Sequence, residues 1–255
     1  MDRTIEIGGR TVRRIGLGTN RLTDSEQNRD FVRHAVAIGV DFIDTARLYT
    51  GGDSERTLGA ALSTPPNGLV LATKGGYHAA DPGTLRREFA ESLASLGTDS
   101  IFLYQLHRVD SAVPLEESVE VLAELQRAGQ IRHLGLSEVT VEQIERARRV
   151  APIVSVQNEY NLSERKHDAV VDYAAQHELA FIPYFPLRHS RSVEARLAEV
   201  APRYGATTAQ VALAWLLRRS PAMLPIPGTL SREHVEEDLA ALDIELADDD
   251  FEALT

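Results

Sequence analysis

Short apolar segments recur along the chain, and longer amphipathic segments separate them. Eight of these apolar segments resemble strands, at positions 13–19, 40–46, 68–74, 100–107, 132–138, 152–158, 179–185 and 222–228. Most of them are apolar at both odd and even positions, which is typical of strands that are buried on both faces of a parallel sheet. This pattern predicts a parallel sheet whose strands are connected by the amphipathic segments.

The amphipathic segments repeat their apolar residues with the spacing of a helix. One stripe contains Leu85, Phe89, Leu93 and Leu96, and Gly97 follows it as a plausible C-terminal residue. Further stripes lie at 31–36, 115–125, 170–174, 211–215 and 235–239. Helix starts are predicted at a capping box over 140–143, at Thr207 or Thr208, at Ser231, and near Ala247 or Asp248.

Alternation of strand and helix over 255 residues predicts an α/β protein with a (β/α)8 TIM barrel. The main alternative is an open doubly wound sheet, whose first turn should carry the pattern G-x-G-x-x-G. The segment 16–21, GLGTNR, has only the first two of these glycines. Asp44 at the end of the second strand would suit that fold as well, so we favour the barrel on the number of strands.

The first residues look like an addition to this barrel. Two short strand patterns flank Gly8 and Gly9, which suit a tight hairpin turn. A hairpin in this place is expected to close the bottom of the barrel. We see no linker or second domain, so we expect residues 1–255 to form a single domain.

Composition restricts the function further. The net charge of −11 argues against nucleic-acid binding, which depends on Lys and Arg neutralising phosphates. There is no cysteine, so disulfides and cysteine-bound metals are excluded. The N-terminus lacks an apolar signal segment, and no apolar stretch approaches the roughly 20 residues of a membrane span. We therefore expect a soluble, cytoplasmic protein, and a monomer because no apolar stripe lacks a place in the barrel.

Four titratable residues stand at or just after the ends of three successive strands. Asp44 ends the second strand and Tyr49 follows it, Lys74 ends the third strand, and His107 ends the fourth. Each alone could be a structural residue, but the active sites of such barrels lie at this end of the strands. A lysine ammonium should lower the pKa of a nearby tyrosine, and an aspartate should keep that lysine charged. The set predicts a proton donor for carbonyl reduction, with a cofactor supplying the hydride.

The motifs that surround these residues resemble those of the aldo-keto reductase superfamily, most closely its bacterial, monomeric, NADPH-using members. They are DFIDTARLY at 41–49, LATKGG at 71–76, YQLH at 104–107, GLSE at 135–138, VQNEYNL at 156–162 and LPIPGT at 224–229. The resemblance runs from about residue 10 to the end of the chain. It implies a barrel reductase in which Tyr49 is the general acid, Lys74 and Asp44 tune it, and His107 orients the carbonyl.

The resemblance also implies a cofactor site. Its residues would be Gly18, Thr19, Asn20, Ser137, Gln157, Tyr184, Leu187, Gly228, Thr229, Ser231, Arg232, Glu237 and Asp238. Tyr184 would stack on the nicotinamide, Ser137 and Gln157 would hold its amide, and 228–232 would bind the phosphates. Two positions depart from the family pattern, because Glu138 and Asp238 stand where relatives have asparagine. NADPH is therefore expected, and NADH is not excluded.

Short loops predict a shallow, open substrate pocket. Its walls would be Asn20, Arg21, Arg47, Leu48, Tyr77 and Phe185. Arg21 and Arg47 would either favour an acidic or phosphorylated carbonyl or be surface charges, and we slightly favour surface charges. Two other functions fit parts of the pattern. One is a non-catalytic redox-sensing subunit that binds the cofactor; the other is a metal-dependent hydrolase, which the spacing of the histidines disfavours.

Overall fold

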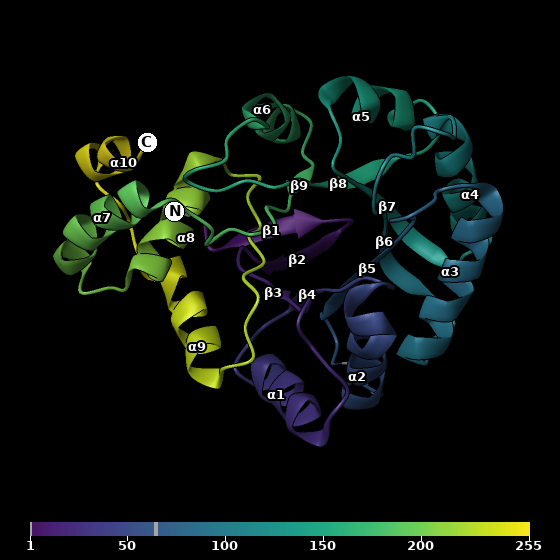
Figure 1. The fold of residues 1–255 in the computed structure, drawn as a ribbon, viewed down its shortest axis with the longest axis horizontal. Helices are drawn as coiled ribbons and strands as arrows, with labels where there is room; N and C mark the ends of the chain where they lie inside the picture. Colours follow the sequence, from purple (N-terminus) through teal and green to yellow (C-terminus); the bar gives the residue numbers. More distant parts are fainter. Residues whose placement is uncertain (1, 64–65) are drawn as a thin grey trace.

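Seven parallel strands form one curled sheet whose order follows the sequence. The computed structural model describes residues 2–63 and 66–255. The strands of this sheet are β3 (Leu17–Gly18), β4 (Phe42–Asp44), β5 (Val70–Gly75), β6 (Ile101–Leu106), β7 (Ile131–Ser137), β8 (Ile153–Gln157) and β9 (Ala180–Phe181). The parallel sheet predicted from the apolar segments is confirmed. The alternative of an open doubly wound sheet is excluded, because the sheet curls into a ring (Figure 1).

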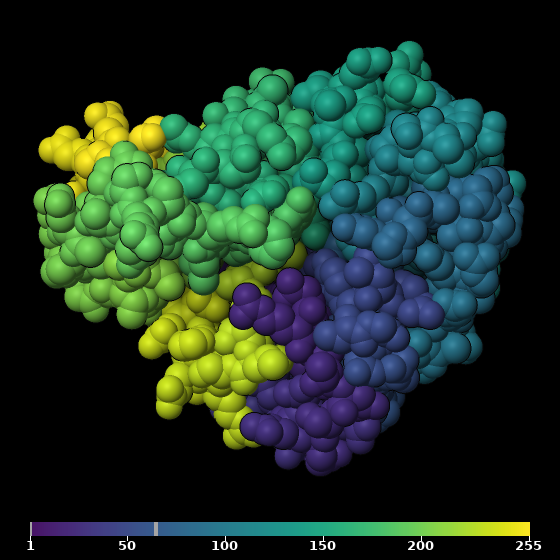
Figure 2. All heavy atoms as spheres, viewed as in Figure 1, coloured from purple at the N-terminus to yellow at the C-terminus, as the bar shows by residue number. Residues whose placement is uncertain are grey.

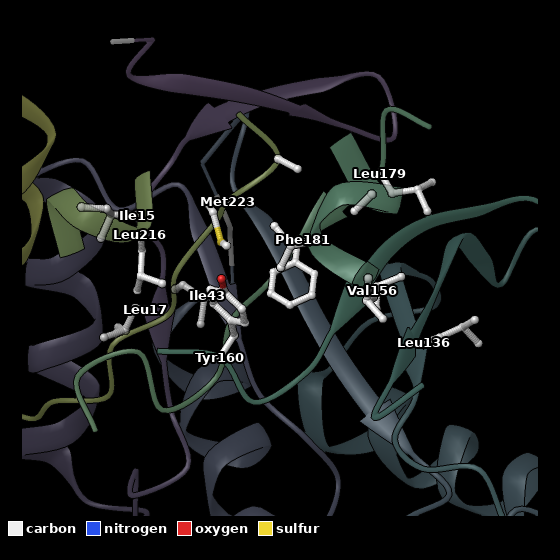
Figure 3. Packing of buried hydrophobic residues seen from close by; sticks show 14 of the residues in the cluster. Ile15, Leu17, Ile43, Leu136, Val156, Tyr160, Leu179, Phe181, Leu216 and Met223 are labelled. Carbon is white, nitrogen blue, oxygen red and sulfur yellow. The ribbon is translucent and has the colours of Figure 1, made fainter. Parts of the chain in front are cut away.

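The eighth predicted strand, 222–228, closes this ring without forming a regular strand. The backbone N–H of Leu224 donates to the carbonyl of Phe181 in β9, while Gly16 and Gly18 donate to the carbonyls of Pro225 and Pro227. Proline has no N–H to donate, so this segment cannot continue a full ladder of hydrogen bonds. Figure 3 shows Met223 next to Phe181, with which it forms a parallel bridge.

Close backbone contact at this closure requires glycine at position 18. Gly18 pairs with Gly228 in a parallel bridge. A Cβ atom on Gly18 would lie only 2.7 Å from the carbonyl oxygen of Ile226. Since real side chains do not approach backbone this closely, any larger residue would open the seam of the barrel beside the site described below.

Helices surround the ring of strands on its outside (Figure 1). They are α1 (Glu26–Ala37), α2 (Asp53–Ala61), α3 (Pro82–Leu96), α4 (Leu115–Arg127), α5 (Val141–Arg148), α6 (Asp168–Gln176), α7 (Arg191–Val200), α8 (Thr208–Arg219), α9 (Arg232–Ala240) and α10 (Asp248–Leu254). The predicted caps at Thr140, Thr207 and Ser231 are present, and Gly97 ends α3 in the left-handed conformation. The apolar stripes did not reveal α2 and α7.

The N-terminal hairpin forms as predicted and covers one end of the ring. It consists of β1 (Thr4–Ile7) and β2 (Arg10–Arg13), joined by two glycines that both have positive φ. Ile7 and Val12 are fully buried and pack against apolar side chains from inside the ring. The hairpin therefore closes the bottom of the barrel with apolar surface, and it leaves the carboxyl ends of the strands uncovered.

Two apolar clusters hold the fold together. The smaller one fills the inside of the ring with Phe42, Val70, Leu103 and Ile182 among others. The larger one lies between the strands and the helices and includes Trp215, which is wholly buried. Within the described residues, no helix combines the length and the apolar character needed to span a membrane.

Candidate active site

The alternation of side chains along the strands directs the polar residues into the barrel. In a strand, every second side chain points to the same face. Phe42 and Val70 belong to the inner cluster, so Asp44 and Lys74, at even steps from them, also point inward. Gln105, His107 and Tyr184 also lie an even number of positions after residues of the inner cluster, so their side chains point inward as well. Apolar residues thus fill the bottom of the barrel, and polar residues form a layer at its carboxyl end.

A pocket of about 630 Å³ opens above this polar layer. Its lining comes from the ends of all the strands of the ring and from the closing segment. The lining residues are Gly18, Thr19, Asn20, Arg21, Asp44, Leu48, Tyr49, Tyr77, His107, Arg108, Ser137, Glu138, Gln157, Tyr184, Phe185, Pro186, Leu187, Arg188, Ile226, Pro227 and Gly228. Figure 2 shows this face of the molecule hollowed where purple, blue and green segments meet.

Lys74 is buried beneath the lining of the pocket and connects Asp44 to Tyr49. Its Nζ donates hydrogen bonds to Oδ1 of Asp44 at 2.6 Å, to the carbonyl of Thr45 at 2.8 Å and to the hydroxyl of Tyr49 at 3.2 Å. Lys74 is wholly buried and Asp44 is 1% exposed. Burial alone would lower the pKa of Lys74, but the charge of Asp44 and the contact with Tyr49 outweigh it, so the pKa is raised. Lys74 is therefore a buried cation held against the tyrosine hydroxyl.

Two amide side chains hold the other oxygen of Asp44. The Nε2 atoms of Gln157 and Gln105 donate to its Oδ2, at 2.9 and 3.2 Å. Sequence reasoning placed Gln157 in the site but missed Gln105. The signal was available, because Gln105 stands two positions before His107 and so points to the same face of β6.

A short turn after β4 presents Tyr49 to the pocket. Tyr49 starts a 3-10 turn, Tyr49–Gly52, in which Thr50 has a φ of 50° and two glycines follow. The hydroxyl of Thr50 donates to the carbonyl of Leu22 at 2.7 Å and so fixes the turn to the loop after β3. This local strain keeps the tyrosine ring above Lys74 instead of letting it point to solvent.

The expected effect of Lys74 on Tyr49 needs a correction. Lys74 does favour the tyrosinate, but burial of the hydroxyl is the larger effect, and the pKa of Tyr49 is raised above its usual value. The prediction of a lowered pKa was wrong because it counted the charge of the lysine and left out desolvation. Tyr49 therefore carries its proton at neutral pH, as a proton donor must.

His107 completes the floor as an uncharged imidazole. It is 8% exposed, and its ring meets the ring of Tyr49 edge to face, with centroids 6.0 Å apart. Burial and the nearby charge of Lys74 lower the pKa of His107 to about 2. Its Nδ1 is buried and has no hydrogen-bond partner among the described residues. A neutral ring in this place can donate a hydrogen bond and cannot act as a cationic acid.

The structure brings only part of the predicted cofactor site to the pocket. Eight of its positions line the pocket, namely Gly18, Thr19, Asn20, Ser137, Gln157, Tyr184, Leu187 and Gly228. Thr229, Ser231, Arg232, Glu237 and Asp238 lie beyond its lining, in the loop after the closing segment and in α9. Ser231 caps α9 by accepting a hydrogen bond from the N–H of His234. Thr229, Ser231 and Arg232 lie at the N-terminus of α9, which is a favourable place for a phosphate, whereas Glu237 and Asp238 lie in the second half of this helix.

Glu138 is one of the two departures from the family pattern, and its carboxylate has a hydrogen-bond partner within the protein. Its Oε1 accepts a hydrogen bond from the backbone N–H of Glu159 at 3.0 Å. Burial and the nearby carboxylate of Glu138 raise the pKa of Tyr184. Glu138 thus connects the loops after β7 and β8, and its charge acts on Tyr184 after β9.

The structure gives definite places to three further residues, which are Asn158, Arg47 and Arg21. The side chain of Asn158 is structural, because it exchanges two hydrogen bonds with the backbone of Val139. Arg47 forms an ion pair with Glu91 at 2.6 Å and does not line the pocket, whereas Arg21 does. The remaining predicted wall residues all line the pocket. Sequence reasoning missed Arg108, which directly follows His107.

Replacing Asp238 by asparagine is expected to stabilise the protein above neutral pH. Burial raises the pKa of Asp238 to about 7, and the charge of Glu237 adds to this effect. The folded protein therefore holds this proton more tightly than the unfolded chain does. The stability that this proton contributes is present below pH ~4 and is lost as the pH rises towards 7.

Urea unfolding at pH 8 and at pH 4 checks this prediction. We expect Asp238→Asn to exceed the wild type by up to about 4 kcal/mol at pH 8 and to match it at pH 4. Asp99→Asn, at an exposed position, is the matched control and should show no such difference. Equal stability of Asp238→Asn and the wild type at pH 8 would contradict the prediction.

Comparison with known proteins agrees with this geometry. The model of the Aldo/keto reductase family matches residues 14–255. An uncharacterized oxidoreductase of Schizosaccharomyces pombe is 38% identical over 98% of this chain and 88% of the relative. A pyridoxine 4-dehydrogenase of Escherichia coli is 36% identical over 96% of this chain and 95% of the relative.

A solved structure points the same way. The aldo/keto reductase from Klebsiella pneumoniae in complex with NADP and acetate superposes with a TM-score of 0.89 at 31% identity. The match covers 100% of this chain and 94% of that one. Because the family model spans nearly the whole chain and the relatives match along most of their length, this chain belongs to the aldo/keto reductase family.

Proposed function

We propose that this protein is an NADPH-dependent reductase that converts an aldehyde or ketone to an alcohol, with Tyr49 as the general acid. The observation that carries the proposal is the buried chain from Asp44 through Lys74 to the hydroxyl of Tyr49 at the floor of the pocket. Family membership supports it, as does the NADP in the structure from Klebsiella pneumoniae. The relative that is a pyridoxine 4-dehydrogenase supports an alcohol and its carbonyl as the reacting pair.

The pocket has features that fit a nicotinamide cofactor. The ring of Tyr184 lines it, so an aromatic ring is available for stacking. Ser137 and Gln157 would hold the amide, and Gly18 and Gly228 leave room at the closure of the barrel. The phosphates would bind at the start of α9, with Thr229 and Arg232. When bound, NADPH would supply the hydride.

Tyr49 would supply the proton. The carbonyl oxygen would take the proton of the tyrosine hydroxyl as the carbonyl carbon is reduced, and the alcohol would form. Lys74 would stabilise the tyrosinate that remains, because its ammonium is already 3.2 Å from the phenolic oxygen. Asp44 keeps the lysine charged and in place, and Gln105 and Gln157 hold Asp44 in turn.

His107 would orient the carbonyl and leave the proton transfer to Tyr49. With its pKa lowered to about 2, the ring is neutral at any physiological pH. A neutral imidazole N–H donates a hydrogen bond to the substrate oxygen, polarises the carbonyl and retains its own proton. The Nδ1 atom of His107 has no hydrogen-bond partner among the described residues.

Oxidation of NADPH in the presence of 4-nitrobenzaldehyde tests the proposal. We expect steady turnover with NADPH, observed as loss of the absorbance of the reduced nicotinamide, and the same assay with NADH measures the cofactor preference. Tight binding of NADPH without turnover of this or any other activated aldehyde would contradict a reductase. That outcome would favour the alternative of a redox-sensing subunit. The monomeric state and the cytoplasmic location remain predictions.

A further inference from the structure

Arg108 is a cation in the lining of the pocket. The pocket lining contains Arg21, Arg108 and Arg188, in a protein whose net charge is −11. Arg188 is paired with Glu159 at 3.1 Å. Among the described residues, no carboxylate lies within ion-pair distance of Arg108. A positive group retained at one point of an acidic surface attracts anions to that point.

The side chain of Arg108 is held in place by an aromatic ring. Its guanidinium carbon lies 4.4 Å from the centre of the ring of Tyr77. Tyr77 in turn meets the ring of His107, with centroids 4.9 Å apart. A guanidinium that stacks on a ring keeps its N–H donors at its edge, where they can bind both oxygens of a carboxylate or phosphate. The stack therefore orders Arg108 and leaves its donors free.

The carboxylates around Arg108 are already used elsewhere. Asp110 accepts hydrogen bonds from the backbone of Ala80 and Ala112. Asp44 is paired with Lys74, and Glu138 accepts a hydrogen bond from the backbone of Glu159. Because none of these acids competes for the guanidinium, its charge is available to a molecule in the pocket.

The position of Arg108 in the ring assigns it to the substrate side. It follows β6, and β6 stands fourth in a ring whose eighth place is filled by the segment 222–228. The phosphates of a cofactor would bind after that segment, directly across the barrel. Arg21 follows β3, next to the same segment, so it could serve either side. Arg108 is adjacent in sequence to His107, and its charge contributes to the lowered pKa of that histidine.

We propose that Arg108 binds an anionic group, a carboxylate or a phosphate, on the carbonyl substrate. The proposal rests on the proposed reductase function and adds a substrate class to it. The aldehyde oxygen would lie at Tyr49 and His107, and the anionic group would lie at the edge of the guanidinium. The substrate would thus carry its negative charge at the end away from the reacting carbonyl.

Matched substrate pairs test this proposal. We would measure kcat/KM with NADPH for 4-formylbenzoate and for its methyl ester, and for glyceraldehyde 3-phosphate and glyceraldehyde. A charge-assisted hydrogen bond at a partly exposed site corresponds to a preference of about tenfold for the anion, mainly through KM. We expect that preference in at least one pair, and the pair that shows it identifies carboxylate or phosphate. Raising the ionic strength should reduce it, because the site is exposed.

Variants of Arg108 connect the preference to this side chain. Arg108→Met should bring the anion-to-neutral ratio close to one, and Arg108→Lys should restore part of it. Arg87→Met, which removes an exposed cation on α3, is the matched control and should keep the ratio of the wild type. Equal kcat/KM values within both pairs, or a preference that survives in Arg108→Met, would overturn the proposal. Absence of turnover with all four aldehydes would instead contradict the reductase function itself.

Discussion

Replacing Tyr49 by phenylalanine is expected to lower kcat for aldehyde reduction by about 10²–10⁴-fold, the usual contribution of a positioned general acid. The substitution removes one oxygen atom, and the only hydrogen bond of that oxygen to the described protein comes from Lys74. The ring that lines the pocket remains. We therefore expect the variant to fold normally and to bind NADPH about as tightly as the wild type does.

Single-turnover oxidation of NADPH with 4-nitrobenzaldehyde measures this effect, and quenching of protein fluorescence measures cofactor binding. Tyr173→Phe is the matched control, because it removes a tyrosine hydroxyl from α6, whose partners are Glu145 and Arg148. It should retain the kcat of the wild type. A Tyr49→Phe variant with more than about a tenth of the wild-type kcat would show that another group donates the proton, since a general acid contributes at least ~10²-fold.

The second large effect concerns the buried pair of Lys74 and Asp44. Asp44→Asn would leave an ammonium with 0% exposure and no counter-charge. Removing one partner of a buried ion pair typically costs about 3–5 kcal/mol of unfolding free energy. Lys74→Met should cost less, because Asp44 keeps the two amide donors of Gln105 and Gln157.

A double-mutant cycle separates the interaction energy between Asp44 and Lys74 from the effects of each residue on its other neighbours. The variant that combines Asp44→Asn with Lys74→Met has no buried charge here, so it should be more stable than Asp44→Asn alone. Urea unfolding at pH 7.5 measures all four proteins, and in the wild type the raised pKa of Lys74 keeps the lysine charged at this pH. The contribution of this lysine is present below its unfolded pKa and is lost only as the pH rises through its higher folded value.

The exposed pair of Arg86 and Glu124 gives a reference for this cycle. Both side chains are at least two-fifths exposed, so Glu124→Gln should cost less than about 1 kcal/mol. If Asp44→Asn lowered the free energy of unfolding no more than Glu124→Gln does, the prediction that Asp44 compensates the buried charge of Lys74 would be contradicted. All three variants at positions 44 and 74 should also lose activity, since each disturbs the group that supports Tyr49.

Much of the site could be read from the sequence because a barrel strand has a simple geometry. Apolar runs marked the strands, and each run ended on a residue whose direction follows from its parity. For this reason the sequence alone could place Asp44, Lys74 and His107 at one rim. The hairpin and the helix caps were also predictable, because glycine pairs and capping boxes act within a few residues.

Interactions between distant segments could not be read in the same way. The hydrogen bonds from Gln105 and Gln157 to Asp44 join three strands, and the hydrogen bond from Glu159 to Glu138 joins two loops. The raised pKa of Tyr49 depends on how deeply the pocket buries a hydroxyl, which is a property of packing. The pairing of Arg47 with Glu91 likewise depends on which helix packs beside the loop after β4.

The sequence by itself determined the parallel barrel, the bottom hairpin and the identity of the four residues at the rim, because local periodicity and strand direction suffice for these. Only the tertiary structure decided the electrostatic state of those residues. Burial is what makes Tyr49 keep its proton, makes His107 neutral and makes Lys74 depend on Asp44. The burial of a side chain depends on neighbours from many strands and loops, so it cannot be predicted from any single stretch of sequence.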